Sequence, residues 1–555
     1  MAKALINPIY SFDEIKEDFI TYVKTAFGTR FDQGINSFEA KREELLNKDG
    51  VFYKEPWIEP IPNYASSNKI ENVNFGGLLN AEERSLFIEF TKRGILKEGF
   101  PLYTHQETML KKALSGDNCV ITSGTGSGKT ESFLLPVFVQ ILKEAKTWST
   151  PNYQNTEWWT GNNSAYPNHI LTSTEVFDNN GKLTPSALQR SGETRESAVR
   201  AMIIYPMNAL VEDQMTRLRT ALDSSDVLEL FDQNSNANII GLNGNRIFFG
   251  RYNGSTPVAG EVNDDNRQYK YAELKRKMEE IKENAEVLDN YLITHPNQRE
   301  EYTSFFPKHH DKNGRRSAEM RSRFDMQQTP PDILITNFSM LSIMLMRKVD
   351  NPIIEKTKVW LAGEQNPDNP TRVFHLIIDE LHLNRGSSGT EIAYLIRVLI
   401  NRLGLTPDSK QLRILSSSAS LPSNDPKSVE FLNNFFGTIN RPFSSGSIIK
   451  ETLPQYNVVQ PLTWLDPTPF IKIQEAYRNN PKDFDDLNTI SQVCFKAAQD
   501  LGCTDRQTNN NGARLLFDMI NTDAYADRLT KVFLVSKGRT NSPALRAIPF
   551  RKKKR

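Results

Sequence analysis

From about residue 102, the chain alternates short apolar runs with longer amphipathic or polar stretches. The apolar runs are often rich in β-branched residues and lie at 119–122, 201–205, 246–249, 332–336, 373–378 and 412–416. Short apolar runs between helical stretches are typical of the buried strands of a parallel sheet. The pattern therefore predicts an α/β domain over residues 99–440, with ligands bound at the carboxyl ends of its strands.

Two stretches of this domain interrupt the alternation and are predicted to be insertions. Residues 145–197 are rich in Asn, Thr, Ser and Trp without periodicity, which favours a long surface excursion. Residues 260–328 contain a helical arm. Its apolar positions alternate spacings of three and four: Tyr271, Leu274, Met278, Ile281, Ala285, Leu288 and Leu292. This arm is either a solvated helix packed on its own domain or a contact for a partner or nucleic acid.

The flanking regions are predicted to be mainly helical and accessory. Residues 1–98 show helical spacing of apolar residues and contain a Pro-rich stretch at 55–64. Residues 441–555 contain helical segments, for example at 485–501 and 512–520, and include the basic run RKKKR at 551–555. Such a run is either a solvated tail or a phosphate-binding or targeting segment.

Composition narrows the class of protein further. The 555 residues include 68 Lys and Arg against 67 Asp and Glu, so any nucleic-acid contact must come from a local patch. Three cysteines and seven histidines form no cluster with the spacing of a zinc site. No apolar run reaches the roughly 18 residues of a membrane span, so we expect a cytoplasmic protein that does not contact a membrane.

A phosphate-binding loop follows the first predicted strand. It comprises Ser123, Gly124, Thr125, Gly126, Ser127, Gly128, Lys129 and Thr130. Small residues let the backbone wrap a polyphosphate and present N–H groups at the start of the next helix. We expect Lys129 to reach the β and γ phosphates of ATP and the Thr130 hydroxyl to bind Mg²⁺. The strict pattern has glycine where this chain has Ser123.

A pair of carboxylates follows the predicted strand 373–378. Hydrolysis of a nucleotide needs one group to hold Mg²⁺ and another to orient the attacking water. We expect Asp379 to hold the metal and Glu380 to polarise the water. His382 is expected to link this site to its surroundings.

The sequence DELH at 379–382 resembles the DExH box of superfamily 2 helicases, and other segments agree in order. The resemblance implies a RecA-like P-loop NTPase fold and assigns Gln106 to adenine. It assigns the segments that resemble motifs Ia and Ib to a nucleic-acid strand, through Pro206, Asn208, Thr336 and Asn337. It also implies that Ser418 and Ser420 couple hydrolysis to movement.

The detailed amino-acid sequence of these segments is similar to that of bacterial helicases that act in DNA repair and antiviral defence. We therefore expect a DNA helicase or translocase that uses ATP and Mg²⁺ on single-stranded or tailed DNA, with RNA left open. The arginine-rich signature of a second RecA-like domain is absent after residue 421. ATP hydrolysis should then be weak unless a partner protein supplies that domain. The alternative is a non-motor subunit in which bound ATP switches DNA or protein binding without appreciable turnover.

Overall fold

The computed structural model describes one compact unit of the chain in detail. The described residues are 64–452, apart from 97–98, 125, 154–156, 162–167, 207–208, 234–240, 259, 296–305, 312, 385 and 424, together with 17–19, 44–46, 472, 492–493 and 495–496. By internal packing, the chain divides into one unit at Tyr64–Leu453 and another formed by Met1–Asn63 and Pro454–Arg555. Most of the predicted helix 485–501, all of 512–520 and the run 551–555 lie outside the described residues.

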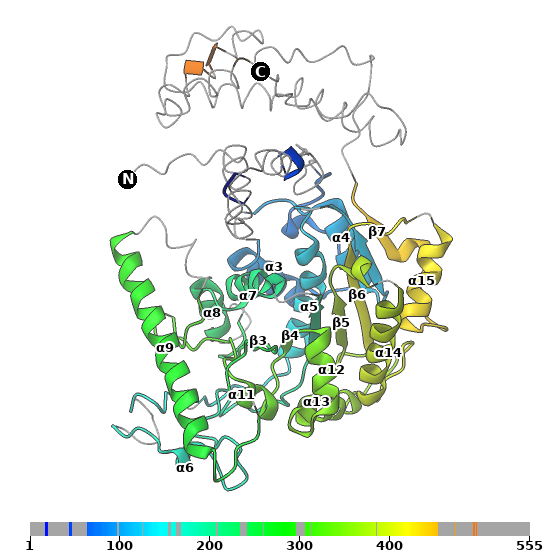
Figure 1. The fold of residues 1–555 in the computed structure, drawn as a ribbon. Helices are drawn as coiled ribbons and strands as arrows, with labels where there is room; N and C mark the ends of the chain where they lie inside the picture. Colours follow the sequence, from blue (N-terminus) through cyan, green and yellow to red (C-terminus); the bar gives the residue numbers. More distant parts are fainter. Residues whose placement is uncertain are drawn as a thin grey trace, which may run out of the picture. The chain divides into compact units, whose positions relative to one another are not determined.

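Seven parallel strands form one sheet in the order β3-β4-β2-β5-β6-β1-β7 (Figure 1). The strands are β1 Cys119–Thr122, β2 Ala201–Tyr205, β3 Phe249–Arg251, β4 Ile333–Asn337, β5 Phe374–Ile378, β6 Leu412–Ser418 and β7 Ile448–Lys450. All carboxyl ends therefore meet at one edge of the sheet. This arrangement confirms the predicted α/β class and the RecA-like fold.

Most of the helices lie on the two faces of this sheet, and two of them belong to a small separate core instead. They are α3 Ala81–Arg93, α4 Thr104–Leu114, α5 Lys129–Ala145, α6 Ser173–Val176, α7 Ala209–Leu222, α8 Ser225–Asp232, α9 Arg267–Thr294, α11 Arg323–Gln328, α12 Phe338–Met346, α13 Asn351–Ala362, α14 Gly386–Arg402 and α15 Pro426–Phe436. Short 3₁₀ helices lie at η1 Ile70–Asn72, η3 Lys348–Asp350, η4 Leu381–Leu383 and η5 Ser445–Ser447.

Strand alternation divides the core between the two faces. On β2, Ile203 belongs to the core that includes residues of α3, α4, α5, α7 and α8, whereas its neighbours Met202 and Ile204 belong to the core that includes residues of α12, α13, α14 and α15. Successive side chains of a strand point to opposite faces, so an unbroken apolar run is required when helices cover both. This requirement explains why the sequence pattern located the central strands well.

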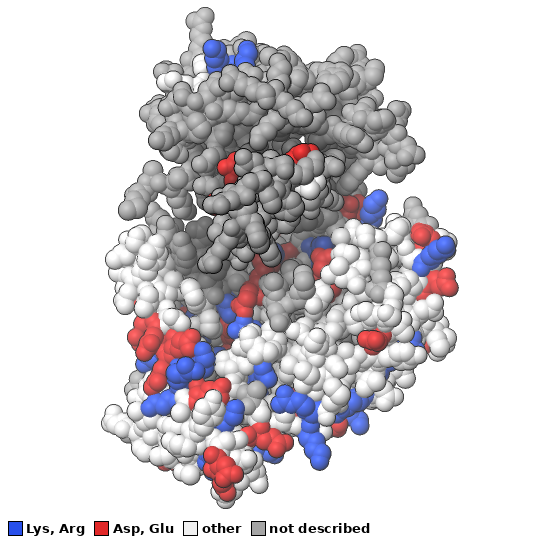
Figure 2. Space-filling model, in the orientation of Figure 1, with Lys and Arg blue, Asp and Glu red and all other residues white. Residues whose placement is uncertain are grey.

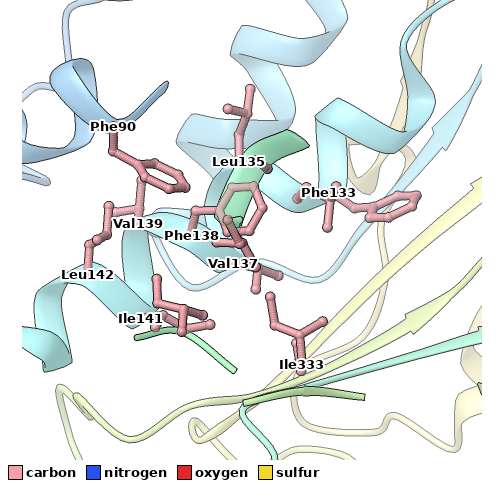
Figure 3. Packing of buried hydrophobic residues seen from close by; sticks show 14 of the residues in the cluster. Phe90, Phe133, Leu135, Val137, Phe138, Val139, Ile141, Leu142 and Ile333 are labelled. Atoms are coloured by element: carbon pink, nitrogen blue, oxygen red, sulfur yellow. The ribbon is translucent and has the colours of Figure 1, made fainter. Parts of the chain in front are cut away.

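Helix α5 lies at the centre of the core that Ile203 shares with α3, α4, α7 and α8. Its apolar side chains, among them Phe133 and Phe138, are buried between the sheet and neighbouring helices. Figure 3 shows these side chains between Phe90 of α3 and Ile333 of β4. The Phe90 ring meets the Phe138 ring edge to face at 5.2 Å and stacks on Phe231 of α8 at 5.9 Å. The helix that begins at Lys129 is therefore held firmly in place.

Two predicted boundaries of the α/β domain differ from the structure. Helix α3 lies before the predicted start at residue 99, yet Phe87 and Phe90 are fully buried in the core of the sheet domain. Strand β7 lies after the predicted end at residue 440 and pairs with β1. Both elements belong to the unit Tyr64–Leu453. Strand β7 was missed because three residues are too few to produce a periodic signal.

The predicted strand 246–249 is also displaced. Strand β3 begins only at Phe249, and the Phe248 N–H before it donates to the Asp332 carboxylate over 2.7 Å. Arg246 is buried and pairs with Asp232 over 2.7 Å.

The prediction of a surface excursion at 145–197 was wrong for its aromatic residues. Trp158 and Trp159 are 2% and 4% exposed and belong to a small separate core with part of α9. The Trp158 ring lies 5.7 Å from Tyr271, and Trp159 lies 4.4 Å from His309. Large aromatic side chains can bury much apolar area from irregular backbone, so lack of periodicity did not mean exposure.

The helical arm is α9, and its amino-terminal half packs on its own domain. Leu274 and Met278 are buried in the same small core, and the Tyr271 hydroxyl donates to the Leu171 carbonyl over 2.7 Å. Along the helix, Lys and Glu form pairs such as Lys277–Glu280 at 2.7 Å. Figure 2 shows acidic and basic side chains intermixed on the visible face of the molecule, including over α9. The solvated-helix interpretation therefore accounts for this half of α9.

Among the residues that the structure describes, no helix combines the length and apolar character needed to cross a membrane.

Candidate ATP site and its connections

The phosphate-binding loop joins the end of β1 to the start of α5. Two serines brace it, because Ser127 Oγ lies 2.5 Å from Ser123 Oγ and donates to the Gly124 carbonyl over 2.9 Å. Ser123, which replaces the glycine of the strict pattern, therefore supports the loop. Thr125 lies outside the described residues, whereas the other predicted loop residues lie between β1 and α5 or, for Lys129 and Thr130, in the first turn of α5.

Gly128 ends the loop in a conformation that requires glycine. Its φ of 68° is left-handed, and a Cβ atom there would lie 2.2 Å from the Gln106 side-chain nitrogen. Gln106 Nε2 donates to the Gly128 carbonyl over 3.1 Å, and its Oε1 accepts from the Tyr103 N–H over 2.8 Å. The residue predicted to contact adenine thus lies against the phosphate-binding loop and holds it through its amide.

His105 is a second support of this loop that sequence reasoning did not single out. Its Nε2 lies 2.7 Å from the Ser127 carbonyl, and burial lowers the pKa of the ring below its usual value. The neutral imidazole can donate this hydrogen bond from Nε2. Only the fold reveals this role, because His105 lies on α4 and not in the loop.

The predicted catalytic lysine and glutamate meet in space. Lys129 Nζ lies 3.1 Å from Glu380 Oε1, although 251 positions separate the two residues in the sequence. Both side chains are partly accessible, with exposed fractions of 16% and 24%. The loop after β1 and the acidic segment after β5 therefore form one site at the carboxyl edge of the sheet.

Asp379 is placed and restrained beside this pair. It is buried, and its Oδ1 accepts hydrogen bonds from the Ser417 hydroxyl and from the Glu380 N–H, the latter over 3.0 Å. Burial raises the pKa of the Asp379 carboxyl above its usual value. A buried carboxylate gains from a nearby cation, so this environment suits a metal ligand.

Ser417 is therefore a site residue that the sequence analysis missed. The three consecutive serines at 416–418 gave no reason to choose among them. The alternation of side chains along β6 identifies Ser417 as the serine that faces Asp379. Ser417 lies two residues after Leu415, which packs on the face that carries α5. Asp379 follows Ile377 at the same spacing on β5, and Ile377 packs on that same face.

His382 lies between the acidic segment and the end of β6. Its Nδ1 is 3.2 Å from Glu380 Oε2 and 3.3 Å from the Ala419 N–H. An Nδ1 lone pair that accepts from Ala419 leaves no proton on that nitrogen for Glu380, so the two contacts at Nδ1 are alternatives. The Ser420 N–H lies 3.3 Å from Ser418 Oγ, and the Ser418 carbonyl accepts from Ser123. These contacts place the predicted coupling serines next to both halves of the site.

Thr130, the predicted metal ligand on α5, is almost fully buried. Its hydroxyl accepts a hydrogen bond from Gln214 Nε2 over 3.0 Å. Within the described part of the chain, no group of three or more His, Cys, Asp or Glu side chains could hold a metal ion. Mg²⁺ typically uses one or two protein ligands together with phosphates and water. Thr130 and Asp379 fit that mode of binding.

The four residues predicted to touch nucleic acid have different environments. Pro206 is half-buried after β2, and Asn208 lies outside the described residues. Thr336 is fully buried and its hydroxyl donates to the Tyr252 carbonyl over 2.7 Å, so its side chain faces the protein interior. The Asn337 side chain accepts from the Met340 N–H over 2.7 Å and caps α12. The Thr336 side chain is therefore not exposed to a nucleic-acid strand, and the assignment of these residues to a strand stays a prediction.

The sequence of this domain matches known helicases. Residues 103–245 match the DEAD/DEAH box helicase family. This match confirms the resemblance to superfamily 2 helicases that the motifs indicated.

A curated relative and solved structures add further similarity. The chain is 26% identical over 479 residues to Druantia protein DruE of Escherichia coli (strain UMEA 4076-1), covering 80% of this chain and 22% of the relative. The chain thus spans about a fifth of the length of this relative. It is also similar to DUF1998 helicase MrfA bound to DNA and AMPPNP, with 14% identity, a TM-score of 0.35, and coverage of 83% of this chain and 42% of that one. For DUF1998 helicase MrfA bound to DNA, the identity is 15% and the TM-score 0.33, over 74% of this chain and 34% of that one.

Proposed function

We propose that this chain is the ATP-binding half of a superfamily 2 motor that acts as a DNA helicase or translocase in bacterial antiviral defence or DNA repair. The observation that carries the proposal is the ion pair between Lys129 and Glu380, which unites the two predicted halves of a hydrolytic site. A site that only binds nucleotide has no need of a carboxylate beside its phosphate-binding lysine.

Different residues of the site have different roles in ATP hydrolysis. Backbone N–H groups at the start of α5 and the Lys129 ammonium bind the phosphates, since both carry positive charge toward that point. Mg²⁺, when bound by Thr130 and Asp379, offsets the negative charge of the phosphates. Lys129 must leave Glu380 to bind phosphate, which frees the Glu380 carboxylate to orient and deprotonate water.

We also propose that the chain by itself hydrolyses ATP only slowly. In related phosphoryl transfers, an arginine supplied by another domain or protein raises the rate by about 10³ to 10⁵. We infer that a second RecA-like domain from a partner supplies such an arginine.

The test is steady-state ATP hydrolysis by the purified chain, with single-stranded DNA, with single-stranded RNA and without nucleic acid, beside Glu380→Gln. We expect DNA to stimulate turnover, and we expect Glu380→Gln to reduce turnover by about 100-fold or more, the contribution of a general base. Nucleotide binding by the variant should persist, because the amide removes the counter-charge of Lys129 without changing the shape of the side chain.

Glu391→Gln is the matched control, since Glu391 is an exposed residue of α14. Unchanged turnover in Glu380→Gln would contradict the catalytic role of Glu380. Tight ATP binding without turnover under any condition would instead favour the nucleotide switch. Stimulation by RNA alone would contradict the DNA assignment.

A further inference from the structure

Tyr205, the last residue of β2, has a buried hydroxyl group next to the ATP site. The side chain is fully buried and belongs to the core that contains α5. Within the described part of the chain, the hydroxyl oxygen has no hydrogen-bond partner. Burial of a hydroxyl without a partner costs free energy, because the hydrogen bonds that it made to water are lost. Such groups are rare in native proteins, so this one requires a physical reason.

The strand register places Tyr205 beside Asp379. Ile204 of β2 pairs with Ile378 of β5, and the Asp379 N–H donates to the Ile204 carbonyl over 3.1 Å. Tyr205 and Asp379 come next on these two strands, and adjacent strands lie about 4.8 Å apart. Tyr205 belongs to the core that contains α5, and so does Ile377, two residues before Asp379. The two side chains therefore project from the same face of the sheet.

The Asp379 carboxylate has one oxygen that is engaged and one that is available. Its Oδ1 accepts from the Ser417 hydroxyl and from the Glu380 N–H. Among the described residues, none donates a hydrogen bond to Oδ2. Ser417 lies on β6, on the opposite side of β5 from β2. Asp379 thus lies between two hydroxyl-bearing residues, and only the hydroxyl of Ser417 is bonded to it.

Charged groups of three elements act on the Tyr205 hydroxyl. They are Asp379 after β5, Glu131 in the first turn of α5, and Asp213 and Arg217 of α7. Burial raises the pKa of Tyr205 well above its usual value, and Asp379 adds to this increase. The hydroxyl therefore stays neutral at any working pH, with its oxygen available as a hydrogen-bond acceptor. Glu131 directly follows Thr130, the second predicted metal ligand, so the hydroxyl lies close to both parts of the metal site.

We propose that Tyr205 is a positioning residue of the Mg²⁺ site, whose hydroxyl oxygen accepts a hydrogen bond from a water molecule of the ion held at Asp379. Mg²⁺ usually keeps several water molecules when it binds to a protein. The hydrogens of such water point away from the ion and toward acceptors. Asp379 Oδ2 and the Tyr205 oxygen are two neighbouring acceptors, which together orient this water. The inference rests on the proposed function, because it uses the same metal site.

The test compares Tyr205→Phe in the full chain with the unaltered chain. Phenylalanine keeps the ring in the core and removes only the oxygen. Binding of a fluorescent, non-hydrolysable ATP analogue is measured in EDTA and over a series of Mg²⁺ concentrations. We expect the affinity in EDTA to stay unchanged. The gain in affinity from Mg²⁺ should fall about two- to tenfold, the value of one hydrogen bond, and half-maximal binding should need more Mg²⁺.

Thermal unfolding without nucleotide separates this role from a structural one. Tyr205→Phe should unfold at the same temperature as the unaltered chain or at a higher one, because it removes a buried polar group that has no partner. Unfolding at a lower temperature would overturn the inference, since the hydroxyl would then be bonded within the protein.

Tyr153→Phe is the matched control, because the Tyr153 hydroxyl is likewise buried and without a partner in the part of the chain that the structure describes. The Tyr153 ring meets Phe248, which directly precedes β3, so this tyrosine lies toward the opposite edge of the sheet from the ATP site. The control should keep the full gain in affinity from Mg²⁺. A Tyr205→Phe protein that also keeps it would overturn the inference. Equal losses of affinity with Mg²⁺ and in EDTA, or an equal loss in the control, would overturn it as well.

The two proposals fail in different ways. If the unaltered chain shows no Mg²⁺-dependent nucleotide binding, the proposed function fails and the inference fails with it. If the unaltered chain gains affinity from Mg²⁺ and Tyr205→Phe gains it equally, only the inference fails.

Discussion

At the scale of single residues, the residues that carry the chemistry were easier to predict than the residues that hold them in place. Lys129, Asp379 and Glu380 could be identified from sequence because phosphate and metal chemistry demands these groups after buried strands. Lys129 and Glu380 lie 3.1 Å apart because the order of strands in the sheet brings the ends of β1 and β5 close together. His105, Gln214 and Ser417 could not be found in this way, because each acts through a contact that depends on the packing of a different element.

Gly128 allows a direct test of the loop geometry. Gly128→Ala should lower both stability and nucleotide affinity, because its left-handed backbone costs about 1–2 kcal/mol for an L residue and its Cβ would meet Gln106 at 2.2 Å. Thermal unfolding and binding of a fluorescent nucleotide measure the two effects.

Gly77→Ala is the matched control, because Gly77 has a φ of 84° with no atom within 4 Å of the added Cβ. This control should lose stability and keep nucleotide affinity. Equal affinity in the two variants would contradict the importance of the contact with Gln106.

At the scale of elements, the central strands were predictable and the insertions were not. Strands buried on both faces must be apolar throughout, which marked β1, β2, β4, β5 and β6 within a residue or two. The segment 145–197 instead contributes isolated aromatic and charged side chains whose partners lie far away in the sequence. Part of its attachment to the sheet is ionic, which no periodic pattern signals.

Asp332, directly before β4, is the centre of that attachment. It is fully buried and pairs with Arg195 over 2.6 Å and with Arg200 over 2.8 Å. Arg195 belongs to the insertion, whereas Arg200 lies directly before β2. These arginines hold the pKa of the Asp332 carboxyl below its usual value.

Asp332→Asn should destabilise the fold by about 3–5 kcal/mol, because it removes a buried carboxylate and leaves Arg195 paired only with Glu193 and Arg200 only with Glu144. Equilibrium urea unfolding followed by tryptophan fluorescence measures the change. Asp368→Asn provides the control, since Asp368 is an exposed partner of Lys410 and its loss should leave the unfolding curve unchanged. Similar curves for the two variants would show that the buried network contributes little.

At the scale of the whole molecule, the boundaries of the α/β domain were the least predictable feature. The sequence placed them at residues 99 and 440, whereas the compact unit is Tyr64–Leu453. Helix α3 supplies core residues to the sheet without belonging to the strand alternation, and β7 is only three residues long. Neither element has a local sequence pattern that would assign it to the domain.

Two fragments test these boundaries. A fragment of residues 64–453 should fold and bind nucleotide with the affinity of the full chain, because it retains the whole core and site. A fragment of residues 99–440 should fail to fold cooperatively, because it loses Phe87 and Phe90 from the core and uncovers the edge of β1. Thermal unfolding and nucleotide titration distinguish them. Cooperative unfolding of the shorter fragment would contradict the structural boundaries.

The backbone of Glu380 has a consequence for the evolution of this chain. Its φ of 50° lies in the left-handed region, which a side chain with a Cβ atom adopts only under strain. Glycine would relax this strain and would also remove the carboxylate. Under selection for thermal stability alone, substitutions at this position would therefore be favoured at the expense of turnover. The persistence of glutamate at such a position would record selection for chemistry against the preference of the backbone.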